Sequence, residues 1–355
     1  MAAPPLGKLS RQAFDALIAP HLGAARPGQV LVGPRHGVDV AILRTAPGQV
    51  MAVTADPLSL IPELGVEASA WLSAQLLASD VATSGLEPAF AVVDYNLPPQ
   101  MDDETLARYQ QALHRALADL GVAVVGGHTG RYPGCDYTII GAGVMMATGP
   151  EDRWVCSATA RPGDACVVTK GAAVAATGIL ARVFPETARR VLGDEGAREA
   201  AAVFGQFGVV KEARLAAALG VRSGGVSAMH DATEGGVLGA IAEMAEASGL
   251  GAVVEREAIP VSPVTRELCR AFFGMDPYTA LGEGALVLAV DPARAAELQA
   301  RLGAEGIRAA IVGRFEAPGH GRWVVEPDGR KTLLAPPAAD PYWAAYARAR
   351  ESGWR

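Results

Sequence analysis

Apolar residues in the first 150 positions follow two patterns, one typical of helices and one typical of strands. Spacings of three and four residues predict helices over residues 8–25, 67–85 and 103–120. Short apolar runs that end in glycine, proline or aspartate predict strands between these helices. The expected strands are a hairpin-like stretch at 29–43 and single strands at 49–56, 90–94, 122–125 and 137–148. This half is therefore expected to be β-rich, and Pro57 is expected to end the strand before it.

The pattern changes after a turn-rich segment at residues 148–163, where we place a domain boundary. Beyond it, strands and helices alternate, which predicts an α/β or α+β domain. The expected strands are 164–170, 284–290 and 307–315, and the expected helices are 171–183, 195–220, 263–274 and 293–304. We therefore divide this mixed α+β chain into an N-terminal domain (1–155), a C-terminal domain (156–335) and a tail (336–355). The tail is rich in aromatic residues and is expected to form a peripheral helix.

Residues 227–249 combine a strand, a polar cluster, two glycines and a helix within one short stretch. Apolar residues at helical spacing predict the helix that follows the glycines. Gly249 lies where a residue of positive φ would end this helix. Asp231 and Glu234, three residues apart, resemble a capping pair at its N-terminus. The stretch is therefore expected to form a strand–turn–helix unit.

A helix N-terminus preceded by glycines is also a candidate phosphate site. Its free N–H groups and its dipole favour an anion, and Gly235 and Gly236 would let a phosphate approach the backbone closely. Lys170 and Gly171 join a strand to a helix, so they form a second, weaker turn of this type. The alternative for the first turn is structural: its acidic residues only cap the helix and its glycines only turn the chain.

Three aspartates of the first half lie at polar positions within apolar surroundings. Asp39 is set among valines in a strand-like stretch, Asp56 closes a strand, and Asp80 lies among small residues of a helix. A carboxylate inside an apolar strand is costly unless it is paired or binds a cation. Taken one by one, such aspartates are commonly caps or turn residues. Three of them in one domain favour a Mg²⁺–phosphate site, because Mg²⁺ prefers oxygen ligands and keeps substrate phosphates in its shell.

The composition argues against several classes of function. The 355 residues carry a formal net charge of −7 and no basic run, which argues against a nucleic-acid partner. Every apolar run is interrupted before it reaches membrane-spanning length, and the N-terminus lacks the apolar core of a signal peptide. We therefore expect a cytoplasmic protein without a membrane partner. Four cysteines without metal-binding spacing are expected to be reduced thiols: Cys135, Cys156, Cys166 and Cys269.

Six segments, in this order, resemble the AIR-synthase superfamily, whose fold is PurM-like. They are GVDVAIL (37–43), VTAD (53–56), ASDVATSG (78–85), VVGGHTG (124–130), MHDATEGG (229–236) and LGEGALVLA (281–289). The superfamily includes aminoimidazole ribonucleotide synthase, thiamine-monophosphate kinase, selenophosphate synthetase and the hydrogenase-maturation protein HypE. The segment MHDATEGG with the downstream GEG looks most like HypE, which has HDPTRGG and NEG at these places.

This resemblance implies ATP hydrolysis, with an N-terminal domain that dimerises into a barrel and a C-terminal domain that closes over the nucleotide. By matching position, Asp39, Asp56 and Asp80 would be the carboxylates that hold Mg²⁺ and the phosphates. A nucleotide-binding loop of the superfamily is matched here by Gly126, Gly127, His128 and Thr129.

In the C-terminal domain the resemblance implies a cluster that faces the phosphates. His230 and Asp231 match its catalytic part, and Thr233 and Glu234 match its nucleotide-binding part. Glu283 matches the acid of the NEG motif and is the candidate general base. The alternative for this residue is an ordinary glutamate in a turn.

Departures from the HypE pattern bear on the acceptor. Val38 replaces one of a pair of aspartates, and Glu234 reverses the charge of an arginine where phosphate would lie. Mg²⁺ or Lys170 would have to lie between Glu234 and a triphosphate. No cysteine follows Cys269, so a substrate carried on a C-terminal cysteine is not expected. The absence of an early cysteine with a nearby lysine argues against selenophosphate synthetase.

We therefore expect a HypE-like homodimeric enzyme that uses ATP and Mg²⁺ to phosphorylate an amide or carboxylate oxygen. The acceptor is expected to be external, either a small molecule or a side chain of a partner protein, with hydrogenase or metalloenzyme maturation as one setting. Two alternatives stay open: a small-molecule kinase of the thiamine-monophosphate type, and a non-catalytic nucleotide-binding scaffold. ATP turnover distinguishes the scaffold from the two enzymes.

Overall fold

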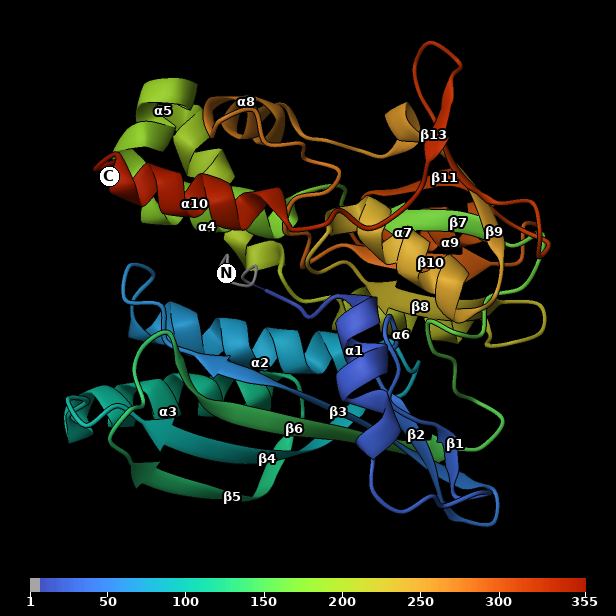
Figure 1. The fold of residues 1–355 in the computed structure, drawn as a ribbon, viewed down its shortest axis with the longest axis horizontal. Helices are drawn as coiled ribbons and strands as arrows, with labels where there is room; N and C mark the ends of the chain where they lie inside the picture. The colour runs from blue at the N-terminus through green and yellow to red at the C-terminus, as the bar shows by residue number, and fades with distance from the viewer. Residues whose placement is uncertain (1–6) are drawn as a thin grey trace.

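The computed structural model describes residues 7–355 as two β-sheets with helices packed around them (Figure 1). The first sheet has six strands in the order β1-β2-β3-β6-β4-β5. Its strands are β1 (Val30–Val32), β2 (Ala41–Ala46), β3 (Gln49–Ser59), β4 (Pro88–Leu97), β5 (Ala123–Arg131) and β6 (Ile139–Pro150). β4 and β5 pair in parallel, and the other neighbours are antiparallel. The β-rich character expected for the first half is confirmed.

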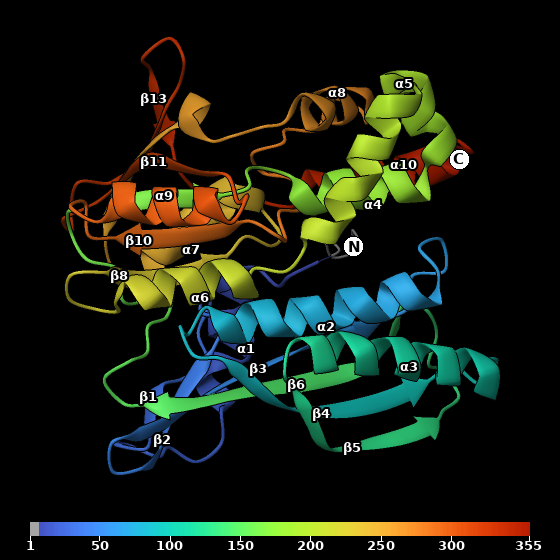
Figure 2. The ribbon, with the colours of Figure 1, turned by 180° about the vertical axis from the view of Figure 1, so that it is seen from behind.

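Two helices, α2 (Val66–Ala82) and α3 (Asp103–Asp119), stack on one face of this sheet (Figure 2). α2 approaches the sheet and α3 closely because it carries serines at the contact. The buried Ser73 Oγ accepts a hydrogen bond from Tyr109 Oη at 2.9 Å. α3 begins at Asp102, whose side chain caps the first turn. Both helices lie where the sequence predicts them.

The strand that carries Asp56 is longer than the sequence predicts, because it runs through Pro57 to Ser59. β2 pairs with β3 only as far as Val53, while β6 pairs with β3 along its whole length. Beyond Val53 one edge of β3 is therefore free, and a proline can be accommodated there. The expectation that Pro57 ends the strand is wrong, and Asp56 lies inside the strand.

The second sheet has seven strands in the order β13-β12-β9-β11-β7-β10-β8. They are β7 (Ala165–Thr169), β8 (Val226–Asp231), β9 (Gly251–Glu255), β10 (Leu286–Val290), β11 (Ala309–Glu316), β12 (Arg322–Val325) and β13 (Lys331–Leu333). The helices α6 (Val210–Leu219), α7 (Gly236–Ala247) and α9 (Ala295–Ala304) pack on this sheet. Gly249 follows α7 with a φ of 69°, as predicted. β9, β12 and β13 lie outside the strands predicted from the sequence.

Four further helices surround an apolar cluster beside the second sheet. They are α4 (Val174–Val183), α5 (Pro185–Ala202), α8 (Pro263–Ala271) and α10 (Pro341–Glu351). α10 buries Tyr342 and Ala345 in this cluster, and Trp354 stacks on Phe273 with ring centroids 5.0 Å apart. The tail is therefore part of the core, and the expectation of a peripheral helix is wrong.

The segment before the first sheet forms the short helix α1 (Arg11–Leu17), which lies between the two halves of the molecule in Figure 1. Short 3₁₀ helices occur at η1 (Ala19–His21), η2 (Val203–Gln206) and η3 (Arg256–Ala258). Within residues 7–355, no helix combines the length and the apolar character needed to cross a membrane. One apolar cluster draws side chains from both sheets, and the proposed domain limits stay a prediction.

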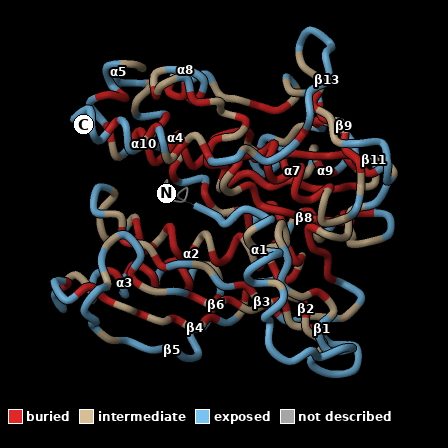
Figure 3. Tube along the Cα trace, viewed as in Figure 1, coloured by how far each residue is buried: buried red, intermediate tan, exposed pale blue. Residues whose placement is uncertain are grey.

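The strand β5 forms an open edge of the first sheet and is exposed along its length, in contrast to the buried β8 and α7 (Figure 3). Several apolar side chains on and near this edge face solvent. The exposed fractions are 46 % for Val124, 58 % for Val125 and 40 % for Phe90. A long exposed edge strand with apolar side chains is a surface that natural proteins usually cover.

Candidate functional site

A cavity of about 760 Å³ lies between the two halves of the molecule. α2 and β3 line it from the first half, and the end of β8 and the turns around Thr233 and Glu283 line it from the second. The N-terminal segment around Lys8 and the C-terminal helix α10 complete its wall. Its size lies in the range typical of small-molecule sites.

Five carboxylates meet at one end of this cavity, which we call the acidic end. Asp39 precedes β2, Asp56 lies in β3, Asp80 lies in α2, Asp231 ends β8 and Glu283 precedes β10. They lie close enough to influence one another's ionisation. The three aspartates that the sequence singles out in the first half are thus brought together with two acids of the second half.

Burial and mutual repulsion make several of these carboxyl groups hard to ionise. Burial raises the pKa of Asp56 to about 6, and burial together with the charge of Asp39 raises the pKa of Asp231 to about 7. Burial and the neighbouring aspartates raise the pKa of Asp80 well above its usual range. Thr54 Oγ1 donates a hydrogen bond to Asp80 Oδ2 at 2.9 Å. This bond lowers the pKa of Asp80, but it does not offset the rise. A bound cation would reverse these shifts and release protons.

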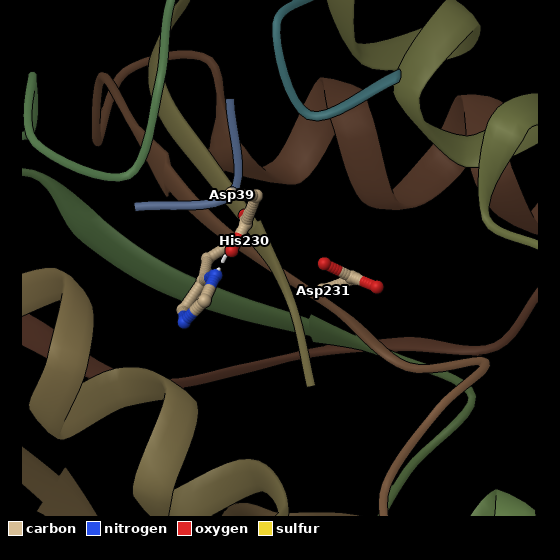
Figure 4. A group of neighbouring side chains, drawn as sticks. All are labelled: Asp39, His230 and Asp231. Atoms are coloured by element: carbon tan, nitrogen blue, oxygen red, sulfur yellow. Dashed lines mark hydrogen bonds and ion pairs between the residues drawn. The ribbon is translucent and has the colours of Figure 1, made fainter. Parts of the chain in front are cut away.

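His230 lies between two carboxylates beside the acidic end. Its Nδ1 is 2.7 Å from Asp39 Oδ2, and its Nε2 is 2.9 Å from Glu243 Oε2. Figure 4 marks the contact between Asp39 and His230 with a dashed line. Burial alone would lower the pKa of His230, but the two carboxylates raise it well above its usual range. Burial alone would likewise raise the pKa of Glu243, but the hydrogen bond and charge of His230 lower it to about 2. The three side chains form a buried, charged triad.

This triad changes the role expected for His230. The side chain is 1 % exposed, it does not line the cavity, and both ring nitrogens are engaged by carboxylates. His230 therefore positions Asp39 and has both ring nitrogens engaged, and the catalytic role expected for it stays a prediction. The sequence reasoning missed Glu243, although a carboxylate on the apolar face of a predicted helix was the available signal.

The acidic end has the ligand chemistry of a Mg²⁺ site. Donor atoms of Asp39, His230 and Asp231 lie within 4.8 Å of one another, but a protonated imidazole is not a metal ligand. Without His230, this group keeps the carboxylate oxygens of Asp39 and Asp231, and Asp56 and Asp80 line the same end of the cavity. Asp231 Oδ1 is buried without a hydrogen-bond partner. Oxygen donors of this kind fit a hard divalent cation.

Lys8 brings a positive charge to the acidic end, and no motif in the sequence points to it. Its Nζ donates a hydrogen bond to Thr233 Oγ1 at 2.7 Å, and its backbone N–H donates to Glu234 Oε2 at 2.8 Å. Desolvation alone would lower the pKa of Lys8, but four carboxylates, led by Glu243 and Asp39, raise it. Thr233 and Glu234 line the cavity as expected, and they also hold the N-terminal segment in place.

The carboxyl group of Glu283 is hard to ionise in this environment. Its Oε2 atom is buried without a hydrogen-bond partner. Burial raises the pKa of Glu283 well above its usual range, and the nearby Asp340 and Asp231 raise it further. The alternative of an ordinary turn glutamate is disfavoured, because a solvent-exposed turn side chain would have neither property.

The N-terminus of α7 already holds an anion. Asp340 Oδ2 accepts the N–H of Gly235 at 2.8 Å, and the N–H of Gly236 donates to a backbone carbonyl at 3.1 Å. Neither glycine lines the cavity. Both N–H groups are thus engaged within the protein, and the phosphate site expected at Gly235 and Gly236 stays a prediction. The expected capping pair is wrong, because neither Asp231 nor Glu234 caps α7.

The second strand-to-helix turn, at Lys170 and Gly171, is also occupied by contacts within the protein. Lys170 Nζ donates to two backbone carbonyls before α6, at 2.7 and 2.8 Å, and lies 2.5 Å from Glu212 Oε1. Gly171 packs so tightly that a Cβ atom there would lie 2.3 Å from the carbonyl oxygen of Pro260. Neither residue lines the cavity, and the nucleotide-binding roles expected for Lys170 and Gly171 stay predictions.

The expected loop at Gly126–Thr129 is part of an extended strand. Gly126, Gly127, His128 and Thr129 lie in β5, pair with β4 and do not line the cavity. A Cβ atom on Gly127 would lie 1.9 Å from the carbonyl oxygen of Val93, so close strand packing requires glycine here. Within one copy of the chain these four residues do not reach the acidic end, and their part in nucleotide binding stays a prediction.

Two packed sheets with carboxylates from both halves around one cavity define the PurM-like class of α/β proteins. The family model of the N-terminal domain of AIR synthase related proteins matches residues 37–145. The model of the C-terminal domain matches residues 161–326. The chain belongs to the family of AIR synthase related proteins, as its sequence motifs predict.

Individual relatives agree with this assignment. "Carbamoyl dehydratase HypE" of Azotobacter vinelandii is 30 % identical over 252 residues, which cover 68 % of each chain. The structure of HypE from E. coli has a TM-score of 0.69 at 24 % identity and covers 89 % of this chain and 94 % of that one. A structure of HypE in complex with ATP has a TM-score of 0.65 at 22 % identity and covers 93 % of both chains. The expected fold is therefore confirmed.

Proposed function

We propose that this chain is an ATP- and Mg²⁺-dependent enzyme that transfers the γ-phosphoryl group of ATP to an oxygen of an external acceptor. That oxygen belongs to an amide or a carboxylate of a small molecule or a partner protein. The carrying observation is the acidic end, where Asp231 Oδ1 and Glu283 Oε2 are buried without partners among other carboxylates. Buried polar atoms without partners are rare and point to a ligand.

In this proposal, the residues at the acidic end have separate roles in binding Mg²⁺ and ATP. Asp39, Asp56, Asp80 and Asp231 hold Mg²⁺, and His230 fixes the first of these by its hydrogen bond. Bound Mg²⁺ would neutralise charge on the phosphates and on the transferring phosphoryl group. The ammonium group of Lys8, already at the cavity wall, adds a second positive charge on the nucleotide side.

Glu283 is the proton-transfer residue in this proposal. Because its pKa is raised, it is protonated in the ligand-free cavity and first acts as a hydrogen-bond donor. A cation bound at the acidic end would lower the pKa of Glu283 and so convert it to the carboxylate, the form that can accept a proton. Glu283 could then accept the proton that an amide acceptor loses from its nitrogen as its oxygen is phosphorylated; an ionised carboxylate acceptor has no proton to lose.

The comparisons support an ATP-using enzyme but leave the acceptor open. No cysteine is among the cavity-lining residues of the described chain, which supports an external acceptor. A structure of a HypE–HypF complex is among those of similar fold, and it supports a partner protein in a maturation pathway. A thiamine-monophosphate kinase bound to AMPPCP and TMP is another. The aromatic side chains that α10 places in the cavity favour such a small-molecule acceptor as the second candidate.

A homodimer through the first sheet is part of the proposal. The exposed edge β5, with Val124 and Val125, together with the neighbouring Phe90 of β4, offers an apolar surface for a second copy. Pairing there would extend the sheet toward a barrel. The free thiols of the described chain are consistent with the cytoplasm as the proposed compartment.

Turnover of ATP by the purified full chain tests the proposal. Phosphate release is measured with Mg²⁺, with EDTA, and with candidate acceptors, and an acceptor-stimulated, Mg²⁺-dependent rate is expected. ATP binding without consumption under all of these conditions would instead support the scaffold. Light scattering of the same sample reports the oligomeric state, for which a dimer is expected.

A further inference from the structure

The helix α10 forms one wall of the cavity, and the residue before this helix is a buried carboxylate. Tyr342, Trp343 and Tyr346 of α10 line the part of the cavity that we call the aromatic end. Asp340, the N-cap residue of α10, is 5 % exposed and does not line the cavity. It also lies outside both segments that the family models match. Because a buried carboxylate is costly unless it is hydrogen-bonded, its partners indicate what it does.

The carboxylate of Asp340 accepts three backbone N–H groups, which belong to three different segments. Its Oδ1 accepts the N–H of Tyr342 at 2.8 Å, in the first turn of α10. The same oxygen accepts the N–H of Leu281 at 3.3 Å, and Oδ2 accepts the N–H of Gly235 at 2.8 Å. Burial raises the pKa of Asp340 to about 6, and the three hydrogen bonds limit this rise, so the group is ionised at neutral pH. Capping α10 uses only one of the three bonds.

The other two bonds reach the two loops that carry site residues of the second half. One is the Glu283 loop (residues 281–285), in which Leu281 and Glu283 line the cavity. The other is the α7 turn (residues 232–235), in which Thr233 and Glu234 line the cavity. From a position outside the cavity, Asp340 therefore connects the Glu283 loop to the α7 turn.

The two loops are in direct backbone contact. The N–H of Gly282 donates to the carbonyl oxygen of Thr233 at 3.1 Å, and the N–H of Ala232 donates to that of Ala285 at 2.9 Å. A Cβ atom on Gly282 would lie 3.0 Å from the Cβ of Ala232 and 3.2 Å from the Cα of Gly236. Such close packing leaves little room for one loop to shift without the other. A bond from Asp340 to each of them thus fixes the pair.

The position of the Glu283 carboxyl group depends on this loop. Its Oε2 atom is buried without a hydrogen-bond partner, so the backbone has to hold the side chain in place. Besides burial, the charges of Asp340 and Asp231 raise the pKa of Glu283, while Lys8 lowers it. Burial and neighbouring groups, Glu283 among them, also raise the pKa of Tyr342, so the acidic end and the aromatic end meet at Glu283.

We propose that Asp340 is a positioning residue for the phosphoryl transfer, because its carboxylate holds the Glu283 loop against the α7 turn. The inference rests on the proposed function, in which Glu283 transfers a proton. A displacement of about 1 Å at a reacting group can lower a rate by about 100-fold, so a residue that fixes the loop would act on the reaction without touching the substrate. The alternative is that Asp340 only caps α10 and stabilises the fold.

Two variants of Asp340 separate these roles. Asp340→Ser keeps an N-cap for α10, but its hydroxyl is too short to reach the N–H groups of Gly235 and Leu281. Asp340→Asn is the milder variant, because its amide oxygen can still accept from Leu281 and Tyr342, while its NH₂ group cannot accept from Gly235. Asp102→Ser is the matched control, since Asp102 caps α3 with an exposed side chain and does not line the cavity.

Hydrogen exchange of the ligand-free full chain and steady-state turnover of MgATP are measured on the same samples. In Asp340→Ser, the amides of the Glu283 loop should exchange about three- to tenfold faster, because a backbone hydrogen bond is lost. Turnover at saturating MgATP should fall by about ten- to 100-fold, while KM for ATP stays nearly the same. Asp340→Asn should lie between Asp340→Ser and the parent in both measurements, and Asp102→Ser should match the parent.

Each result decides between the two roles. Faster exchange of the Glu283 loop together with a lower kcat supports the positioning role. Unchanged exchange overturns it, because Asp340 would then not hold the loop. Faster exchange with the kcat of the parent also overturns it and leaves a structural cap, and a raised KM with an unchanged kcat would assign Asp340 to ATP binding instead. If Asp340→Ser does not fold, Asp340→Asn decides by the same criteria.

The parent chain separates this inference from the proposed function. A parent that consumes no ATP with any acceptor would remove the proposed function, and the positioning role with it. An active parent whose turnover is the same in both Asp340 variants would remove the positioning role alone.

Discussion

The two ends of the cavity differ in both chemistry and origin. The acidic end consists of carboxylates from segments that the family models match, such as Asp56 in the first and Asp231 in the second. The aromatic end depends on α10, which lies beyond residue 326 and outside those segments. The difference suggests how such a protein is built. Under the proposed function, the charge that would handle phosphate lies in the family domains, while α10 adds an aromatic wall from beyond them.

The largest effect is expected at Glu283, where the two ends meet. Glu283→Gln keeps the size of the side chain but cannot accept or release a proton. Turnover of MgATP should fall by about 10²–10⁴-fold while ATP affinity stays nearly the same. Steady-state rates and calorimetric binding measure the two quantities separately. Glu257→Gln, an exposed substitution in η3, is the control. Equal turnover of Glu283→Gln and the parent would remove proton transfer from the account.

A substitution within the charged triad of Asp39, His230 and Glu243 should lower the free energy of unfolding. His230→Gln removes the positive charge between Asp39 and Glu243, so two buried carboxylates lose their partner. Loss of one member of a buried charged network costs about 3–5 kcal/mol in the free energy of unfolding. Denaturant unfolding measures this cost. His114→Gln, on the exposed face of α3, should change stability by less than about 0.5 kcal/mol.

The triad also predicts a pH dependence of stability. Because the folded-state pKa of His230 is raised, its contribution is fully present below the unfolded pKa of about 6.5 and is lost as pH rises through the folded pKa. The free energy of unfolding of the parent should therefore fall as the pH rises above about 6.5. If the free energy of unfolding of His230→Gln changes with pH in the same way as that of the parent, the imidazole is not charged in the folded protein.

Mg²⁺ affinity should depend on pH at the acidic end. The pKa values of Asp56, about 6, and Asp231, about 7, lie above those of ordinary aspartates, so both groups must release protons when the metal binds. Affinity should rise with pH between about 5 and 8, by at most about tenfold per pH unit for each proton released. Calorimetry in buffers of different ionisation enthalpy counts the protons. Asp231→Asn should make the profile shallower, and an unchanged profile would contradict this assignment.

The smallest effect is expected at Lys8. Its ammonium group competes with a metal for the carboxylates and attracts the nucleotide phosphates. Lys8→Gln should tighten Mg²⁺ binding without nucleotide, and weaken ATP binding, by about two- to fivefold each. Lys211→Gln, which removes an exposed cation from α6, is the matched control. Changes of the same sign in both affinities would argue against this position for Lys8.

Much of the acidic end could be predicted because its signals are local. Asp39, Asp56 and Asp80 stand out as carboxylates within apolar strands or a helix, and Asp231 and Glu283 lie in recognisable motifs. The strand–turn–helix unit at 227–249 also follows from local spacing. Each of these predictions needed only neighbouring residues, or motifs in a fixed order.

The remaining features depend on contacts between distant segments. Asp340 reaches the N-terminus of α7 from more than 100 positions away, and it takes the N–H group that the glycines seemed to offer a phosphate. Asp39 and His230 are 191 positions apart, so the sequence pattern around His230 does not indicate that its imidazole is hydrogen-bonded to a carboxylate. Pro57 is tolerated because its strand has one free edge beyond Val53. None of these contacts leaves a periodic or local signature.

The central claim is that the carboxylates of the acidic end bind a nucleotide through Mg²⁺, and calorimetric titration of ATP tests it most directly. ATP is titrated into the full chain with Mg²⁺ and with EDTA, and the same pair of titrations is made with Asp56→Asn. Tight binding is expected only with Mg²⁺, and Asp56→Asn should weaken it by about tenfold or more. Equal affinity in EDTA, or an Asp56→Asn variant that binds MgATP like the parent, would contradict the claim.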